Sequence, residues 1–289
     1  MAKDFGLDVS WPNGYLEALT CDIVHIQKIL SLKIIWVIFF YRLCGITVVF
    51  DIDDQPGKKI KSFLGCLVIL YLASVVTVDS DARRDFWKKY LLFKKIVVIN
   101  DVADTTDLQL KINIREDYCD SCSFFWIGHA SNILSIEKFI EFVTVNRDYS
   151  LTICTNEKEI PALTEIYPVI RFIPWSRDVA FENSINARFM VLNHNFDQAS
   201  LLKSENKMVL SILAGFIPLV SRTPAYEKLA NSLNADFLIF DSLNDVPTIT
   251  NKIASADFQL FSSKNFSYIE ANYSKSAVLA AFISKVLVR

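Results

Sequence analysis

Two lysines enclose a polar segment at the point where an apolar helix is predicted to begin. The segment KSENK, residues 203–207, is followed by the apolar run MVLSILAG. A helix start offers unpaired backbone N–H groups and a partial positive charge, and both favour an anion. Lys203 and Lys207 add full charges, while Ser204 and Asn206 can hydrogen-bond phosphate or sugar oxygens. These residue types predict a pyrophosphate-binding segment, with a pair of solvated surface lysines as the alternative.

Further residues with functional chemistry lie at or just after apolar, β-branched runs that predict strands. Gly128 and His129 follow FFWI, Trp175 follows IRFIP, His194 sits in an Asn-His-Asn triplet after ARFMVL, and His25 lies in DIVHIQ. His129 can approach a phosphate beside the glycine turn, Trp175 can stack on a base, and His25 can lie near an acceptor. Each also has a structural interpretation as a core or turn residue. They form no nucleophile–base–orienter set, so we expect chemistry that depends on positioning and electrostatics.

These residues are positioned by strands that alternate with helices along most of the chain. Strands are predicted over residues 22–27, 46–53, 74–80, 94–101, 124–128, 150–156, 170–176, 187–195, 216–221 and 235–242. Helices are predicted over residues 32–45, 57–73, 81–91, 133–146, 160–168, 204–214 and 267–286, with Gly45 and Gly215 ending two of them and Ser204 or Glu205 capping one. Such alternation predicts parallel sheets covered on both faces, an α/β fold.

The alternation lapses once, in a polar stretch from Val102 to Ser123, which we take as a domain boundary. We therefore expect two Rossmann-like domains, residues 1–112 and 120–265, and a C-terminal helix over residues 266–289 that crosses back to the first domain. In such domains ligands bind at the carboxyl ends of the strands, where the candidate residues lie.

The composition excludes several classes of protein. The chain has 289 residues, of which 52% are hydrophobic and 21% charged, so it can bury a sizeable core and is not a disordered protein. Its net charge of −2 disfavours a nucleic-acid partner. The longest uncharged run, Ser62–Val78, has 17 residues and is too short to span a membrane comfortably. No secretory signal is visible, so we expect a cytoplasmic protein.

The charge is concentrated in one region. Lys58–Lys95 holds nine basic residues and three acidic ones. This pattern is typical of a solvated face, or of a surface that meets an anionic partner such as membrane lipid at the inner face of a membrane.

Residues 203–229 resemble the donor-binding segment of GT-B glycosyltransferases of the large group-one, family-four kind. In that group a helix ending in Ala-Gly leads through Pro and Val into a strand and then a second helix. The matching residues here are Ala214, Gly215, Pro218, Val220, Thr223 and Pro224. Six further segments are similar, in the same order, to successive segments of this group. They are CDIVHIQ, GITVVFDIDDQP, ASVVTVDSDARRDFWKKY, KKIVVINDVADTTD, FFWIGHASN and NFSYIEANYSKSAVLAAFISKVL. The resemblance covers most of the chain and implies two Rossmann-like domains facing a cleft.

Two features depart from that group. Many members carry a glutamate five residues before the helix-ending glycine, where it contacts the donor, and this chain has Leu210 there. Asp197 and Glu205 are the nearest acidic residues that could make this contact instead. The chain resembles a subset of the group that has a Lys-Ser-x-Asn-Lys/Arg signature in place of the glutamate. The usual first strand with its glycine-rich loop is also not visible, which predicts an N-terminal, acceptor-side domain that is reduced or is completed by another chain.

The resemblance implies transfer of a sugar from a nucleotide-diphosphate sugar to a cell-surface glycan or lipid-linked acceptor. The predicted catalytic residues are Lys203, Lys207 and His25, and the predicted donor-binding residues are Gly128, His129, Trp175, His194, Ser204, Asn206 and Glu227. The alternative is a catalytically weak or inactive GT-B module that binds a nucleotide or a protein partner, an interpretation that Leu210 motivates.

We expect no cofactor beyond the donor and no metal. Asp51, Asp53 and Asp54 have the spacing of a metal-chelating Asp-x-Asp motif. GT-B enzymes do not need that metal, because lysines and a helix start stabilise the leaving diphosphate. We therefore interpret these carboxylates as cleft-lining or structural.

Overall fold

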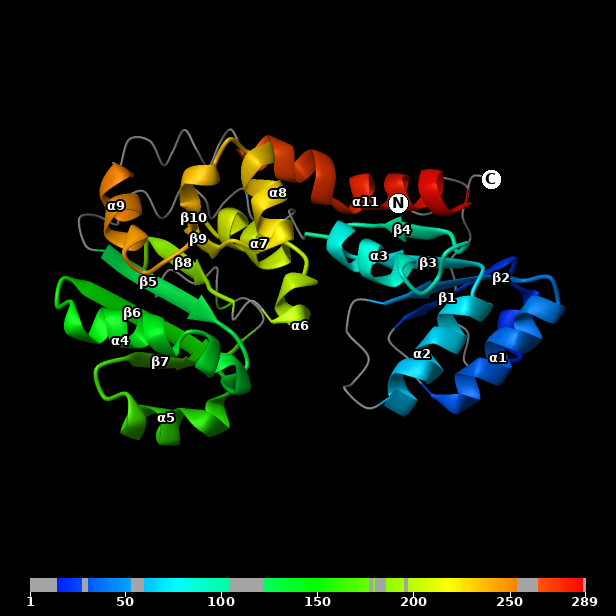
Figure 1. The fold of residues 1–289 in the computed structure, drawn as a ribbon, viewed down its shortest axis with the longest axis horizontal. Helices are drawn as coiled ribbons and strands as arrows, with labels where there is room; N and C mark the ends of the chain where they lie inside the picture. Colours follow the sequence, from blue (N-terminus) through cyan, green and yellow to red (C-terminus); the bar gives the residue numbers. More distant parts are fainter. Residues whose placement is uncertain are drawn as a thin grey trace. The chain divides into compact units, whose positions relative to one another are not determined.

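The computed structural model divides the chain into two compact units. Unit 1 comprises Met1–Val102 and Lys275–Arg289, and unit 2 comprises Ala103–Ser274, so the chain passes between the units twice (Figure 1). The structure describes residues 15–27, 31–52, 60–103, 122–176, 179, 186–194, 197–253 and 265–287. The predicted domain limits at residues 112 and 120 lie outside these ranges.

Unit 1 is built on a parallel sheet in the order β1-β2-β3-β4. Its strands are β1 (Ile23–Gln27), β2 (Thr47–Asp51), β3 (Val75–Val78) and β4 (Ile96–Val98), and its helices are the 3-10 helix η2 (Glu17–Thr20), α1 (Leu32–Leu43), α2 (Ile60–Leu72), α3 (Asp81–Lys88), α11 (Lys275–Phe282) and the π-helical turn η8 (Ile283–Leu287). Because crossovers between parallel strands are right-handed and this order never reverses, the intervening helices lie on one face. Figure 1 shows α1 and α2 on one side of this sheet and α11 on the other.

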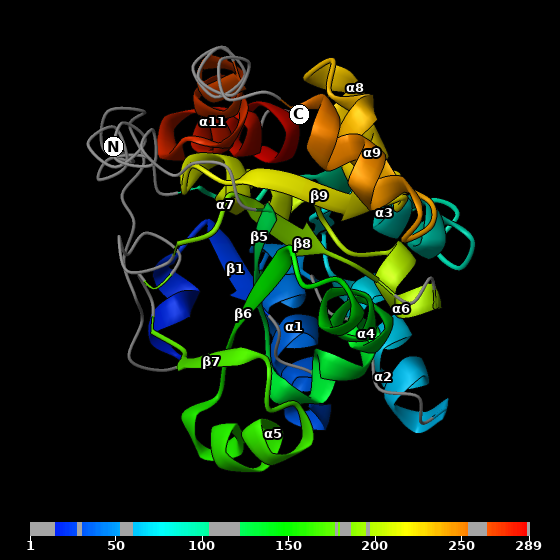
Figure 2. The ribbon, with the colours of Figure 1, turned by 90° about the vertical axis from the view of Figure 1, so that its left-hand side faces the viewer.

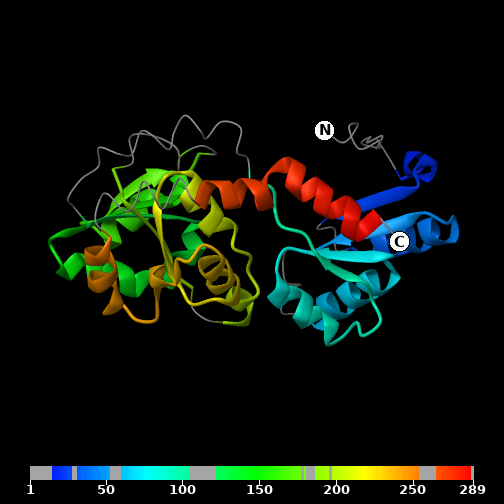
Figure 3. The same cartoon turned by 90° about the horizontal axis from the view of Figure 1, so that it is seen from above.

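The alternation of side chains along the strands separates the two faces. On β2, Val48 and Phe50 join the core beneath the helices, whereas Val49 packs with Val286 of η8. Phe282 of α11 belongs to the same small cluster, and Figure 3 shows α11 lying across these strands. The C-terminal helix therefore supplies the cover for the second face of the sheet.

Unit 2 contains a parallel six-stranded sheet in the order β10-β9-β8-β5-β6-β7. Its strands are β5 (Cys122–Ile127), β6 (Tyr149–Thr155), β7 (Arg171–Pro174), β8 (Phe189–Leu192), β9 (Ile217–Ser221) and β10 (Ile239–Phe240). Its helices are the 3-10 helices η4 (Ala130–Ser135), η5 (Glu157–Glu159) and η7 (Asp236–Leu238), with α4 (Glu137–Val145), α5 (Ile160–Ile166), α6 (Gln198–Leu201), α7 (Asn206–Leu213), α8 (Pro224–Ser232), α9 (Asp245–Lys252) and a helix over 265–273. The strand order reverses between β5 and β8, which pair side by side in the middle of the sheet (Figure 2).

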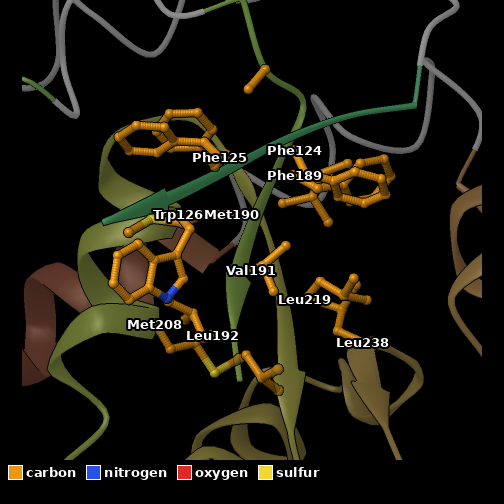
Figure 4. Close-up of a cluster of buried hydrophobic side chains, with 14 of the residues drawn as sticks. Phe124, Phe125, Trp126, Phe189, Met190, Val191, Leu192, Met208, Leu219 and Leu238 are labelled. Carbon is orange, nitrogen blue, oxygen red and sulfur yellow. The ribbon is translucent and has the colours of Figure 1, made fainter. Parts of the chain in front are cut away.

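The core of unit 2 packs on both sides of these central strands. Phe124, Phe125 and Trp126 of β5 are buried with Phe189 and Met190 of β8. Figure 4 shows these side chains together with Met208 of α7, Leu219 of β9 and Leu238. This packing holds β5, β8 and the start of α7 in a fixed arrangement.

The predicted fold class is confirmed, because the chain has two parallel sheets in an α/β arrangement. Gly45 and Gly215 end α1 and α7 with φ of 80° and 77°, a conformation that glycine adopts without strain. The predicted final helix is two helices that meet at Ser274. The short helix α6 and the helix α9 were not predicted from the sequence. Within the described residues, no helix is long and apolar enough to cross a membrane.

Candidate functional site

The candidate site lies where the strand order of unit 2 reverses. At such a point neighbouring connections leave the sheet in opposite directions and open a crevice at the carboxyl ends of the strands. β5 ends at Ile127, followed by Gly128, and β8 ends at Leu192, two residues before His194. The start of α7 is joined to this edge, because the ammonium group of Lys207 donates to the carbonyl oxygen of Ile127 at 2.9 Å.

Lys207 is a half-buried cation. Its Nζ also lies 5.7 Å from the ring centre of Trp126. Burial, with the charge of Lys203 acting in the same direction, lowers the pKa of Lys207 to about 8. No carboxylate among the described residues forms an ion pair with Lys207. A bound anion would supply that missing countercharge.

Gly128 provides space for the Trp126 side chain. A Cβ atom at Gly128 would lie 2.5 Å from Cη2 of Trp126, too close for any residue with a side chain. The amide of Gly128 donates to the carbonyl oxygen of Cys154 at 3.1 Å, so this N–H is already used within the sheet. We therefore assign Gly128 the task of letting Trp126 pack against the loop beside Lys207.

The Gly128→Ala substitution should lower the free energy of unfolding by about 1–3 kcal/mol, because the methyl group forces the buried Trp126 to move. Urea unfolding measures the loss. Gly65→Ala in α2 is the matched control, since a Cβ atom there meets nothing within 4 Å and alanine favours helix. Equal stability of Gly128→Ala and the unmodified chain would contradict the assignment.

His129 organises its own loop. Its Nδ1 accepts a hydrogen bond from the amide of Ser131 at 3.3 Å and lies 2.9 Å from the Ser131 hydroxyl. The amide of Ala130 donates to Asn156 Oδ1 at 3.1 Å. An accepting Nδ1 places the ring proton on Nε2, so His129 presents a donor to solvent.

His194 is buried in a polar pair with Tyr226. Its Nε2 lies 3.1 Å from the Tyr226 hydroxyl, and its amide donates to the Ser221 hydroxyl at 3.0 Å. Burial lowers the pKa of His194 to about 4, with the charges of Lys203 and Lys207 acting in the same direction. The imidazole is therefore neutral at pH 7 and adds no positive charge to the two lysines.

The start of α7 is tied to the end of unit 2. Glu205 occupies the N-cap position, but its side chain makes no capping bond, and Oε1 accepts a hydrogen bond from the Tyr273 hydroxyl at 2.6 Å. The carbonyl oxygen of Tyr273 in turn accepts from the amide of Ala103 at 2.8 Å. The chain enters unit 2 at Ala103 and leaves it at Ser274. Tyr273 therefore connects this entry and exit point to the segment that carries Lys203 and Lys207.

Leu210 lies on α7 at the position where the resemblance places a glutamate. It is half-buried and packs against the core of unit 2. Ser204 and Asn206 are half-buried at the start of the same helix. The carboxylate nearest in sequence, Glu205, is engaged with Tyr273.

The remaining predicted site residues are carried by other elements. Glu227 accepts a hydrogen bond from Arg222 Nη1 at 2.6 Å, and Arg222 also pairs with Asp241 at 2.7 Å. Trp175 is exposed after β7, an edge strand of the sheet. His25 lies on β1 of unit 1, with its ring 5.8 Å from that of Phe282.

The candidate metal motif is only partly described. Asp53 and Asp54 lie outside the described residues, and Asp51 accepts a hydrogen bond from the Thr77 hydroxyl at 2.7 Å.

Three side chains of this region, Trp126, Tyr226 and Tyr273, were not predicted from the sequence. Each reads as a core aromatic in the sequence. The glycine two residues after Trp126 was the one available signal, because a glycine beside a buried strand marks close approach. Tyr226 and Tyr273 meet their partners across 32 and 68 residues of chain, and no local pattern reports such pairs.

The fold is found in solved glycosyltransferase structures. TarM of S. aureus superimposes with a TM-score of 0.64 and 13% identity, over 94% of this chain and 56% of TarM. HepE of Anabaena, solved with UDP and glucose, gives 0.64 and 10%, over 94% of this chain and 80% of HepE. The chain has the GT-B fold. An alpha-glucosyltransferase solved with UDP shares this GT-B arrangement, with a TM-score of 0.61 and 14% identity, over 96% of this chain and 84% of that enzyme.

These likenesses are structural. No family model matches the sequence, and no curated protein matches it. The chain spans little more than half the length of TarM. At identities of 10–14% the comparison establishes the GT-B fold, and the chemistry must be argued from the residues.

Proposed function

We propose that this chain is a glycosyltransferase that moves a sugar from a nucleotide-diphosphate sugar to an acceptor, a cell-surface glycan or a lipid-linked precursor. The observation that carries the proposal is Lys207. This lysine is half-buried beside Lys203, pairs with no carboxylate of the described residues and lies at the strand reversal of a GT-B unit. UDP or UDP-glucose is bound in the structural neighbours HepE and alpha-glucosyltransferase, which supports the same ligand class here.

In such a transfer the bond between the anomeric carbon and the diphosphate oxygen breaks, and the acceptor oxygen bonds to that carbon. Negative charge then grows on the departing diphosphate. The ammonium groups of exposed Lys203 and half-buried Lys207 would neutralise that charge, and the interaction is stronger at Lys207, which has less water around it. Ser204 and Asn206 would bind phosphate or sugar oxygens at the same helix start.

The proton of the acceptor hydroxyl must also leave. His25 in unit 1 is our candidate to receive it. Loss of solvent around the ring lowers the pKa of His25, and the Asp51 carboxylate opposes that effect, so the ring is available in its neutral form near pH 7. The basic region Lys58–Lys95 belongs to the same unit and would bring the chain to a membrane-bound acceptor.

Calorimetric titration with nucleotides and nucleotide sugars, combined with a turnover assay for released nucleotide, tests the proposal. We expect binding of a nucleoside diphosphate and release of that nucleotide in the presence of acceptor. No binding of any nucleotide or nucleotide sugar would refute the proposal.

Leu210 favours a second candidate, a GT-B module that binds a nucleotide or a protein partner with little or no catalysis. In the group that the chain resembles, a glutamate at this position contacts the sugar nucleotide that serves as donor substrate. A leucine cannot accept a hydrogen bond from that substrate. Binding without turnover in the same titration would support this candidate.

A further inference from the structure

We propose that unit 1 docks on an anionic membrane surface through an apolar patch on α1, α2 and the turn after α3. The docking patch consists of Trp36, Phe40, Leu43, Leu64, Val68, Tyr71, Leu92 and Phe93. The inference gives the membrane contact named above a defined surface, and it requires no transferase activity.

α1 is apolar on two opposite sides. Ile34, Ile38 and Tyr41 are buried against the sheet. Trp36, Phe40 and Leu43 have the same spacing as these buried residues, shifted by two positions. Because two residues correspond to a rotation of about 200° around a helix, these three side chains point away from the sheet. Trp36 is 73% exposed. A surface helix normally carries polar residues on that side.

α2 repeats the pattern. Leu64, Val68 and Tyr71 are exposed at positions i, i+4 and i+7, while Cys66 and Leu70 are buried. α1 and α2 pack against one another on the same face of the sheet. Their outer sides therefore form one surface, because both point away from the same strands.

The turn after α3 extends this surface. Leu92 is exposed and Phe93 is completely exposed, at 101% of its reference area. Lys94 joins the turn to the end of α2, because its ammonium group donates to the carbonyl oxygen of Ala73 and lies 5.7 Å from the ring centre of Tyr71.

The end of α1 is fixed to the same place. Arg42 Nη1 donates to the Ser74 hydroxyl at 2.8 Å. The three turns that lead into β2, β3 and β4 are thus neighbours at the amino edge of the sheet. This edge is opposite to the carboxyl edge, where ligands bind in such sheets.

The charges around the patch identify its partner. Residues 32–43, 60–72 and 88–98 contain seven lysines and arginines and no aspartate or glutamate. A second copy of the chain would bring the same positive charges against this surface, so self-association is disfavoured. An anionic lipid surface accepts both the apolar side chains and the charges, and tryptophan and tyrosine favour the boundary between lipid and water. Patches of this kind mark interaction sites.

Sedimentation of the full chain with vesicles tests the proposal. We expect binding to vesicles of phosphatidylcholine mixed with phosphatidylglycerol, weaker binding at high salt, and little binding to phosphatidylcholine alone. The double substitution Leu92→Ser and Phe93→Ser should weaken binding at least about tenfold, because it removes the most exposed apolar groups. Lys88→Glu with Lys89→Glu should have a similar effect.

Ile166→Ser with Val169→Ser is the matched control. These residues are exposed and apolar, Ile166 at the end of α5 of unit 2 and Val169 in the turn after it, and their replacement should leave vesicle binding unchanged. Nucleotide titration of each variant separates the two proposals. Vesicle binding without nucleotide binding would support the docking surface and refute the proposed function. Equal binding to neutral and anionic vesicles, no vesicle binding, or a dimer that the Leu92 and Phe93 substitutions disperse would each overturn the docking proposal.

Discussion

Replacing Lys207 with methionine should weaken nucleotide binding and at the same time make unit 2 more stable. A hydrogen bond to a charged group contributes about 1.5–3 kcal/mol, so affinity for a nucleoside diphosphate should fall by about tenfold to a hundredfold or more. Stability should rise because the pKa of Lys207 is lowered to about 8, which means that burial disfavours its charged form. Removing that charge should add on the order of 1–3 kcal/mol to the free energy of unfolding at pH 7. Titration calorimetry and urea unfolding measure the two effects.

Lys207 also predicts how binding depends on pH. The ammonium form binds the anion, so affinity should fall as the pH rises above about 8. Lys207→Arg keeps a charge at these pH values and should remove the dependence. Lys138→Met, which replaces an exposed lysine of α4, should change neither affinity nor stability. A Lys207→Met chain that binds nucleotide as well as the unmodified one would show that the lysine serves another purpose.

Acidification from pH 7 to pH 4 should destabilise unit 2 by about 3 kcal/mol through His194 alone, since each unit of pKa shift corresponds to about 1.4 kcal/mol. The pKa of His194 is lowered to about 4 in the folded chain, against a usual value of 6.5. Between these two values the unfolded chain binds the proton and the folded chain does not, so stability falls as the pH falls. Below about pH 4 the contribution is fully lost.

The difference between the unmodified chain and His194→Gln isolates this effect, because other titrating groups are common to both. Urea unfolding, with hydrogen exchange of the peptides that contain β8 and β9 as the readout, confines the measurement to unit 2. We expect the unmodified chain to lose stability more steeply than the variant. Parallel pH profiles would show that His194 is not held neutral by burial.

Most elements of the fold follow from the sequence, because the signals for them are local. The β-branched runs predict the strands, and Gly45 and Gly215 mark where α1 and α7 end. The order of the strands is not a local property. Strand β5 pairs with β8 as well as with β6, and this pairing is decided by which apolar faces pack together. The strand reversal at the candidate site depends on the pairing of β5 with β8.

The site was predictable in part for the same reason. Lys203 and Lys207 were predicted because a helix start with two lysines and polar neighbours suits an anion, although a pair of solvated lysines has the same pattern. The environment of Lys207 was not readable, since it depends on the Ile127 carbonyl and the Trp126 ring, some eighty residues away in sequence. The Tyr273–Glu205 hydrogen bond likewise forms only when unit 2 is folded.

A crystal structure of the chain with UDP would test the central claim most directly. Our account predicts the diphosphate at the start of α7, with its oxygens within hydrogen-bonding distance of Lys207 Nζ and close to Lys203. UDP bound away from the carboxyl ends of β5 and β8, with Lys207 still directed at the Ile127 carbonyl, would contradict it.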